Sequence, residues 1–264
     1  MVRLDGISGN TMSGKVDKNL VSRQFQRAAT TYDSQAMIQY RVADHLLDML
    51  ADNCAGELER VLEIGCCTGL LSRKLIAARP DISELVLNDL VEDFAVPAGN
   101  LSGPLFIRFL AGDIETIALP GPFDLVLSSS TFHWLNDLPG LLEKLARNMT
   151  PGGCLAFSIY GPENLREIRQ LTGIGLDYFS LKEVENMVGR HFTLDRSDQK
   201  EERFCFATPM DILNHLRMTG VNAVNREPWT PGRLQRFTRE YQHLFSDSTG
   251  VFLTYHPVYI VAHR

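Results

Sequence analysis

The sequence has little cysteine, and none of it is spaced as a metal or redox motif. Its five cysteines include no CxxC pair and have no neighbouring histidine cluster. An odd set of this kind excludes a disulfide framework and a zinc site, so we expect no metal and a reducing, cytoplasmic location. No apolar run is long enough to span a bilayer, so we expect no membrane partner. Residues 1–19 also lack the apolar segment of a secretory signal, and we expect a flexible leader there.

The sequence has no excess of basic residues either. Its 26 Lys and Arg stand against 32 Asp and Glu, which gives a net charge of −6. Nucleic-acid binding usually requires a basic surface, so we expect no nucleic-acid partner. Hydrophobic residues form 44% and charged residues 22% of the 264 residues. These fractions are typical of a packed globular protein with one large domain, or one domain and a cap.

Short apolar runs alternate with helical segments through the first 160 residues. The runs are followed by turns or by polar residues, and they are apolar on both faces, as in a sheet that helices cover on two sides. This alternation predicts an α/β fold with a doubly wound, mostly parallel sheet. The five runs lie at 60–64, 84–88, 105–110, 123–128 and 154–159.

The remaining segments predict additions to this sheet. Apolar residues at helical spacing predict two N-terminal helices, over 20–31 and 34–50. We therefore assign 20–160 to these helices and a cofactor-binding α/β core. The alternation is lost after residue 160, and we predict a helical cap over 161–240. Residues 241–264 contain a last apolar run, 251–262, which we expect to complete the sheet of the core as one long strand.

Four of the strand ends carry residues suited to a nucleoside ligand. In an open α/β sheet, ligands bind beyond the carboxyl ends of the strands. The first strand leads into the turn Glu63-Ile64-Gly65-Cys66-Cys67-Thr68-Gly69, where glycine allows a tight turn and a close approach of ligand to backbone. Asp89 ends the second strand and can accept both ribose hydroxyls. Asp113 and Ile114 follow the third and can bind and cover an adenine, and Ser129 follows the fourth, where a transferable group would lie.

Other interpretations of these residues remain. Asp89 and Asp113 could each be a helix N-cap. A dinucleotide is the rival ligand for an acid after the second strand, but its loop requires GxGxxG. The turn from Gly65 to Leu70 lacks the second and third glycines of that pattern, which favours an adenosyl ligand over NAD.

The ordered set resembles the class I S-adenosylmethionine-dependent methyltransferases. The matching segments are VLEIGCCTG at 61–69, LNDL at 87–90, AGDIE at 111–115, FDLVLSSSTFHWLND at 123–137 and PGGCLAFS at 151–158. The resemblance implies a Rossmann-like, seven-stranded sheet and S-adenosylmethionine as cofactor. It implies that Glu63, Gly65, Cys67 and Gly69 belong to the cofactor loop. The family usually has glycine where Cys67 stands, so we expect this side chain to weaken cofactor binding or to displace the loop.

Further segments outside that set resemble one subfamily. They are FQRAATTYD at 25–33, GPENL at 161–165, LRMTGVNA at 216–223 and LTYH at 253–256. Together they resemble the malonyl-acyl-carrier-protein O-methyltransferases of biotin synthesis, the BioC family. The resemblance implies methyl transfer to the free carboxylate of a malonyl thioester, with acyl-carrier protein or coenzyme A as the thiol. A carboxylate is already ionised at pH 7 and needs no general base.

We predict three acceptor-site residues. Arg217 is the candidate to bind the carboxylate, although an exposed arginine near a helix C-terminus is the alternative; Arg166, Arg169 and Arg203 are lower candidates. Tyr32 could close over the cofactor or donate to the carboxylate. His133 lies where the acceptor meets the methyl group.

Two other functions remain open. One is methyl transfer to another small acid or to a ring hydroxyl, which would need a base, and only His133 is well placed for that. The other is a protein that binds S-adenosylmethionine without turnover, which the side chain of Cys67 keeps open.

Overall fold

A seven-stranded sheet organises one lobe of the molecule. A computed structural model describes residues 15–54, 56–101, 105–221 and 229–264. The strand order is β3-β2-β1-β4-β5-β10-β6, with β10 antiparallel to β5 and β6 and the pairs from β3 to β5 parallel. This order confirms the predicted doubly wound, mostly parallel α/β fold. The strands are β1 (Arg60–Ile64), β2 (Glu84–Asp89), β3 (Phe106–Ala111), β4 (Phe123–Ser128), β5 (Met149–Tyr160), β6 (Thr193–Gln199) and β10 (Pro257–His263).

Helices cover both faces of this sheet. Successive residues of a strand point to opposite faces, and Val61 and Leu62 accordingly belong to two different buried clusters. One cluster packs under α3 and α4, the other under α6 and α8. The helices and short 3-10 turns of this lobe are α3 (Met37–Asn53), α4 (Leu70–Ala78), η1 (Glu92–Phe94), α5 (Ala95–Gly99), η2 (Phe132–Trp134), α6 (Leu138–Arg147) and α8 (Leu181–Val188).

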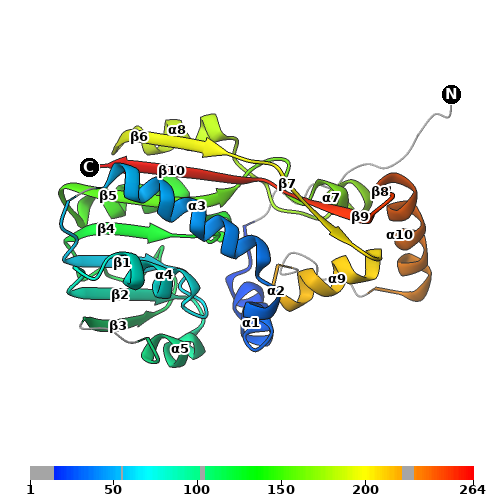
Figure 1. The fold of residues 1–264 in the computed structure, drawn as a ribbon, viewed down its shortest axis with the longest axis horizontal. Helices are drawn as coiled ribbons and strands as arrows, with labels where there is room; N and C mark the ends of the chain where they lie inside the picture. The colour runs from blue at the N-terminus through cyan, green and yellow to red at the C-terminus, as the bar shows by residue number, and fades with distance from the viewer. Residues whose placement is uncertain (1–14, 55, 102–104, 222–228) are drawn as a thin grey trace.

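A second lobe forms the cap, and Figure 1 shows it at the right of the sheet. A three-stranded antiparallel sheet, β7-β9-β8, packs there with three helices. The helices α1 and α2 lie between the two lobes (Figure 1). These elements are α1 (Lys18–Ala28), α2 (Tyr32–Gln35), α7 (Arg166–Thr172), β7 (Glu202–Phe206), α9 (Pro209–Met218), α10 (Pro231–Leu244), β8 (Ser246–Asp247) and β9 (Gly250–Tyr255).

The division of the C-terminal third differs from the expected one. The expected cap over 161–240 is interrupted, because β6 is a strand of the large sheet and α8 packs against that sheet. β6 has the polar sequence TLDRSDQ and lies at the sheet edge, half in solvent, so apolar periodicity does not reveal it. The expected single strand over 251–262 is two strands in two sheets, β9 and β10, which meet at His256.

The expected leader also ends earlier than residue 19. Residues 1–14 lie outside the described part of the chain, but Val16 already exchanges backbone hydrogen bonds with the Asn136 side chain. α1 then begins at Lys18, with the Asp17 carboxylate accepting from the backbone N–H groups of Asn19 and Leu20. The N-terminal helices are therefore anchored to the sheet lobe.

Local sequence signals determine where α9, the helix that carries Arg217, begins and ends. Thr208 and Asp211 form a reciprocal capping box at the start of α9, and Pro209 occupies its first turn. Gly220 follows its end in a left-handed conformation, with φ of 74°. These caps direct α9 across the cap lobe, where it contacts α1 and α2.

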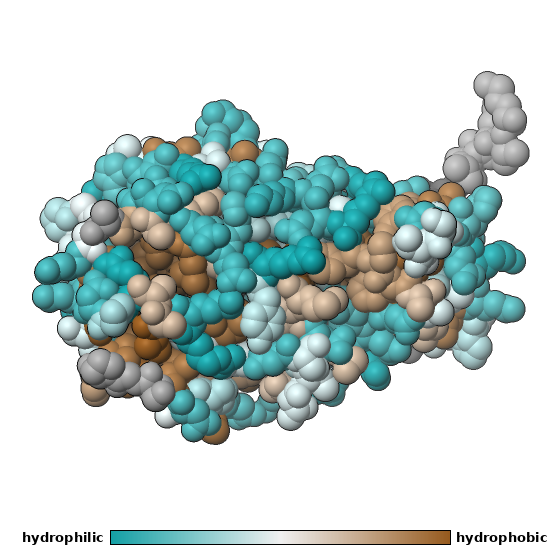
Figure 2. Space-filling model, viewed as in Figure 1, coloured by the Kyte–Doolittle hydropathy of each residue, from teal (hydrophilic) through white to brown (hydrophobic). Residues whose placement is uncertain are grey.

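The surface in Figure 2 is hydrophilic over most of this face, with apolar areas over both lobes. Among the described residues, no helix combines the length and apolar character needed to cross a bilayer. All five cysteines are free thiols.

Candidate active site

Four strand-end loops of the large sheet converge on one cavity. Its wall includes six residues predicted to bind the cofactor: Gly65, Cys67, Asp89, Asp113, Ile114 and Ser129. Residues from α1 and α2 cover the same cavity from the other side. The four strand ends therefore meet at one cavity, as the sequence predicts.

The first loop is folded tightly against the fourth. Gly65 has φ of 74°, and a Cβ at this position would lie 2.1 Å from Thr131 Oγ1. The loop therefore requires glycine there. Cys67 also has a positive φ, 48°, a conformation that L-residues other than glycine, asparagine and aspartate rarely adopt. The backbone thus retains the shape that glycine would give, and Cys67 is one of the residues that line the cavity.

Asp89 links the first two loops and lines the cavity with a carboxylate. Its carboxylate accepts from the backbone N–H groups of Cys67 and Val91, each at 2.9 Å. Burial raises its pKa to about 6, although these hydrogen bonds act in the opposite direction. A carboxylate oxygen can accept more than one hydrogen bond, so Asp89 retains capacity for two ribose hydroxyls.

The third loop is tied to the N-terminal helix. Lys18 Nζ lies 3.3 Å from Asp113 and 2.5 Å from Glu115. Ile114 is buried beside them, where an apolar side chain can cover an adenine ring. Sequence reasoning did not identify Lys18 as a site residue. The spacing of Lys18, Val21 and Phe25, which places them on one face of α1, is the signal that could have found it.

Two predicted loop residues do not line the cavity. Glu63 is 1% exposed and accepts a 2.6 Å hydrogen bond from Ser72 on α4. Burial raises its pKa to about 8, so the side chain is protonated at pH 7. Gly69 has φ of 80° and forms the N-cap of α4. Both residues therefore support the first loop through their contacts with α4 and do not line the cavity.

An aromatic cluster from the N-terminal helices and η2 closes the cavity. The Phe25 ring lies 6.3 Å from Tyr32 and 5.9 Å from Trp134, the latter edge to face. Asp33 fixes α2 through a 2.5 Å hydrogen bond from Thr68 Oγ1 of the first loop. Burial raises the pKa of Tyr32 well above its ordinary value, so its hydroxyl remains neutral and can donate.

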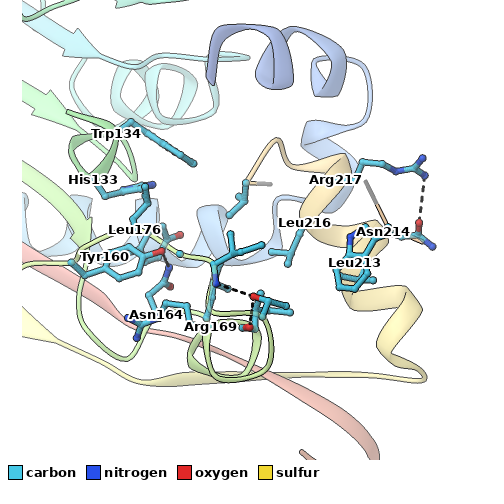
Figure 3. Close-up of a pocket in the computed structure, with 18 of the residues that line it drawn as sticks. His133, Trp134, Tyr160, Asn164, Arg169, Leu176, Leu213, Asn214, Leu216 and Arg217 are labelled. Atoms are coloured by element: carbon cyan, nitrogen blue, oxygen red, sulfur yellow. Dashed lines mark hydrogen bonds between the residues drawn. The ribbon is translucent and has the colours of Figure 1, made fainter. Parts of the chain in front are cut away.

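A second cavity of about 340 Å³ adjoins the first, and Trp134 lines both. It lies between the sheet and the cap, and most of its wall is apolar (Figure 3). His133 lies on this wall, with its ring 4.9 Å from Tyr160. The His133 Nδ1 atom is buried without a hydrogen-bond partner, and burial lowers the pKa of the ring to about 3. His133 is thus a neutral group on the wall of the second cavity, next to Trp134, which lines both.

The predicted acceptor arginine lies at the outer end of this cavity. Arg217 is exposed, and its guanidinium bonds to Asn214 Oδ1 at 3.4 Å. Figure 3 shows it pointing away from His133 and Trp134. Of the lower candidates, Arg166 pairs with Glu163 and Glu201, Arg203 stacks on Phe252, and Arg169 lines the cavity.

The LTYH segment holds the cap in place. Thr254 on β9 bonds to the buried Glu167 on α7 at 2.5 Å, and Tyr255 bonds to His215 on α9 at 2.8 Å. His256 accepts from the backbone N–H of Glu163. Tyr255 and His256 are both buried and line neither cavity. The hydrogen bonds of this segment tie β9 to α7 and α9, which line the second cavity.

Comparisons with known proteins agree with this geometry. Residues 62–157 match a family model described as "Methyltransferase domain". The malonyl-acyl-carrier-protein O-methyltransferase of Chlorobium phaeovibrioides is 40% identical over 96% of this chain and 99% of that protein. The protein of the same name from Bacteroides thetaiotaomicron is 34% identical, covering 94% of this chain and 99% of its own.

Solved structures support the fold. The N-methyltransferase NodS of Bradyrhizobium japonicum, in complex with S-adenosylhomocysteine, superposes with a TM-score of 0.52 at 16% identity over 89% of this chain and 98% of that one. An S-adenosylmethionine-dependent methyltransferase of Mesorhizobium loti has a TM-score of 0.52 at 18% identity, covering 84% and 96%. At such identities the likeness concerns the fold alone.

Proposed function

This chain belongs to the malonyl-acyl-carrier-protein O-methyltransferase family, and on that premise we propose that it methylates the free carboxylate of a malonyl thioester on acyl-carrier protein. The product is the malonyl methyl ester, the form that biotin synthesis uses. S-adenosylmethionine is its cofactor and supplies an electrophilic methyl group on a sulfonium. The observation that carries the proposal is the pair of adjoining cavities that share Trp134.

The residues of the first cavity fit an adenosyl group. Gly65 lets the first loop pack against Thr131, where a Cβ would clash, and both residues line the cavity. Asp89 offers a carboxylate to the ribose, while Asp113 and Ile114 lie where the adenine would be bound and covered. We assign Ser129 to the same wall, and Glu63 and Gly69 to the support of the loop behind it.

The second cavity suits an acceptor that needs no base. A carboxylate with a reference pKa of about 4 is already nucleophilic at pH 7. The chain then has to align the acceptor oxygen with the methyl group and exclude water. Tyr32, Phe25 and Trp134 form an aromatic cover that can do the latter.

The electrostatics of His133 argue against the ring-hydroxyl alternative. A phenol-type acceptor requires a group that takes up a proton near neutral pH. With its pKa lowered to about 3, His133 is a poor base. We propose that it instead contacts the acceptor as a neutral group. The free thiols are also consistent with the cytoplasmic location that we propose.

Incubation of malonyl-acyl-carrier protein with the protein and S-adenosylmethionine tests the proposal. We expect the intact mass of the carrier to increase by one CH2 group, and acetyl-acyl-carrier protein, which lacks the carboxylate, to remain unchanged. Binding of S-adenosylhomocysteine without any mass change on the malonyl carrier would support a protein without this turnover. Malonyl-coenzyme A in a parallel reaction compares the two thiols.

A further inference from the structure

Two residues of the acceptor cavity wall each carry a buried nitrogen atom without a hydrogen-bond partner. Among the described residues, four buried side-chain N or O atoms lack a hydrogen-bond partner: Gln39 Oε1, His133 Nδ1, Arg169 Nε and Tyr259 Oη. His133 and Arg169 are the two of these that lie on the cavity wall. Buried polar groups are nearly always paired in native proteins. Since an arginine Nε can only donate, this atom indicates a ligand with an acceptor oxygen.

The guanidinium of Arg169 is held in one place by its surroundings. Its Nη2 group donates to the carbonyl oxygen of Pro162, and its centre lies 5.3 Å from the centroid of the Tyr178 ring. The side-chain stem passes directly beside Gly175, where an added Cβ would lie 2.4 Å from Arg169 Cδ. Tyr178 is itself fixed by Asn164, which donates to its hydroxyl at 2.9 Å. The positive group is therefore positioned before a ligand binds.

The charge of Arg169 is not neutralised within the described part of the protein. No described carboxylate forms an ion pair with it, whereas the neighbouring Arg166 has three such partners, Glu163, Glu167 and Glu201. A cation beside a largely apolar cavity is unfavourable without a counter-charge. The site therefore favours an anionic ligand over a neutral one.

Arg217 differs from Arg169 in each of these respects. It is exposed at the outer end of the cavity and is bonded only weakly, at 3.4 Å, to Asn214. An exposed charge is screened by water and salt, and it contributes mainly to the encounter with a charged partner.

We propose that Arg169 binds the malonyl carboxylate inside the cavity, and that Arg217 acts at its entrance on an anionic carrier protein. Through the N–H groups of its guanidinium, Arg169 can hold one carboxylate oxygen and leave the other for the methyl group. Methylation removes the negative charge, so the ester is bound less well by Arg169 and leaves. This inference rests on the proposed function, since it names the residue that recognises its substrate.

Variants measured on two substrates separate the roles of the two arginines. The substrates are malonyl-acyl-carrier protein and malonyl-pantetheine, which lacks the carrier. We expect Arg169→Gln to lower kcat/KM about 100-fold on both, chiefly through KM, because a charged hydrogen bond is lost. Arg169→Lys retains the charge and should recover part of the loss. Arg217→Ala should lower kcat/KM only on the carrier protein, by a factor that shrinks as salt is added.

Several results would overturn the proposal. One is Arg169→Gln with the kinetics of the wild type; another is Arg217→Ala with an equal loss on malonyl-pantetheine. A parallel loss of S-adenosylhomocysteine affinity or of thermal stability in Arg169→Gln, without recovery in Arg169→Lys, would assign Arg169 a structural role. If the wild type methylates neither substrate, the proposed function fails instead.

Discussion

Replacement of Cys67 by glycine tests how the cofactor loop tolerates a side chain. The residue lies in the left-handed region with φ of 48°, which costs roughly 1–2 kcal/mol for a residue with a Cβ. Glycine removes this strain, but the backbone entropy that it loses on folding costs about 0.5–1 kcal/mol more than that of a residue with a Cβ. We therefore expect Cys67→Gly to stabilise the protein by roughly 0.5–1 kcal/mol, or about 1–4 °C in Tm for a chain of this size.

The same change enlarges the cofactor cavity, because the side chain of Cys67 is part of its wall. Calorimetric titration should show that S-adenosylhomocysteine binds Cys67→Gly as tightly as the wild type, or more tightly. Cys67→Ala is the matched control, since it removes the thiol and retains the backbone strain. It should leave Tm within about 1 °C of the wild type.

A lower Tm for Cys67→Gly, or equal gains for the alanine and glycine variants, would refute the strain argument. Weaker binding of S-adenosylhomocysteine by Cys67→Gly would show that the loop has adapted to the thiol and uses it.

Other changes probe the groups around the loop. Glu63, with its pKa raised to about 8, takes up a proton on folding. The free energy of unfolding that this group contributes therefore falls as pH rises from about 4 to 8, by up to about 1.4 kcal/mol per pH unit. Glu63→Gln should flatten this pH dependence in urea unfolding curves, and an unchanged dependence would contradict the burial argument. Asp89→Asn should weaken the binding of S-adenosylhomocysteine about 10- to 100-fold in calorimetry, because a charged acceptor is lost. Equal affinity would show that Asp89 does not bind the ribose. Gly65→Ala should abolish binding or folding through its clash with Thr131, whereas a normal circular dichroism spectrum with normal affinity would show that the fourth loop can move. The neutral His133 predicts that kcat at saturating S-adenosylmethionine shows no ionisation near about pH 6.5 that His133→Asn removes. A sigmoidal rise in kcat near about pH 6.5 that disappears in His133→Asn would identify His133 as a base.

The cofactor side of the molecule could be predicted from the sequence because its signals are local. The cavity-lining residues lie at or just after the ends of four strands, and the parallel sheet brings those strand ends to one edge. Asp89 and Asp113 therefore reach one cavity although the intervening segment carries only weak helical signals. Glu63 illustrates the limit of this reasoning. The alternation of side chains along β1 places Glu63 on the sheet face that packs against α4, where it bonds to Ser72.

The acceptor side could not be predicted in the same way, because its geometry depends on contacts between distant segments. β6 is a polar edge strand without an apolar pattern, and β9 and β10 read as one run although they join different sheets. The position of α9 depends on the His215–Tyr255 hydrogen bond, which joins residues 40 positions apart. The sequence therefore identified Arg217 as a candidate, with an exposed arginine as the alternative, and it ranked Arg169, whose Nε atom is buried, below it.

Transfer of a labelled methyl group tests the central claim most directly. With methyl-labelled S-adenosylmethionine and malonyl-acyl-carrier protein, the account predicts label on the acyl group that mild base releases as methanol, as a methyl ester requires. It predicts no label on acetyl-acyl-carrier protein. Label that resists mild base, or that appears equally on the acetyl carrier, would contradict the assignment of the carboxylate as the acceptor.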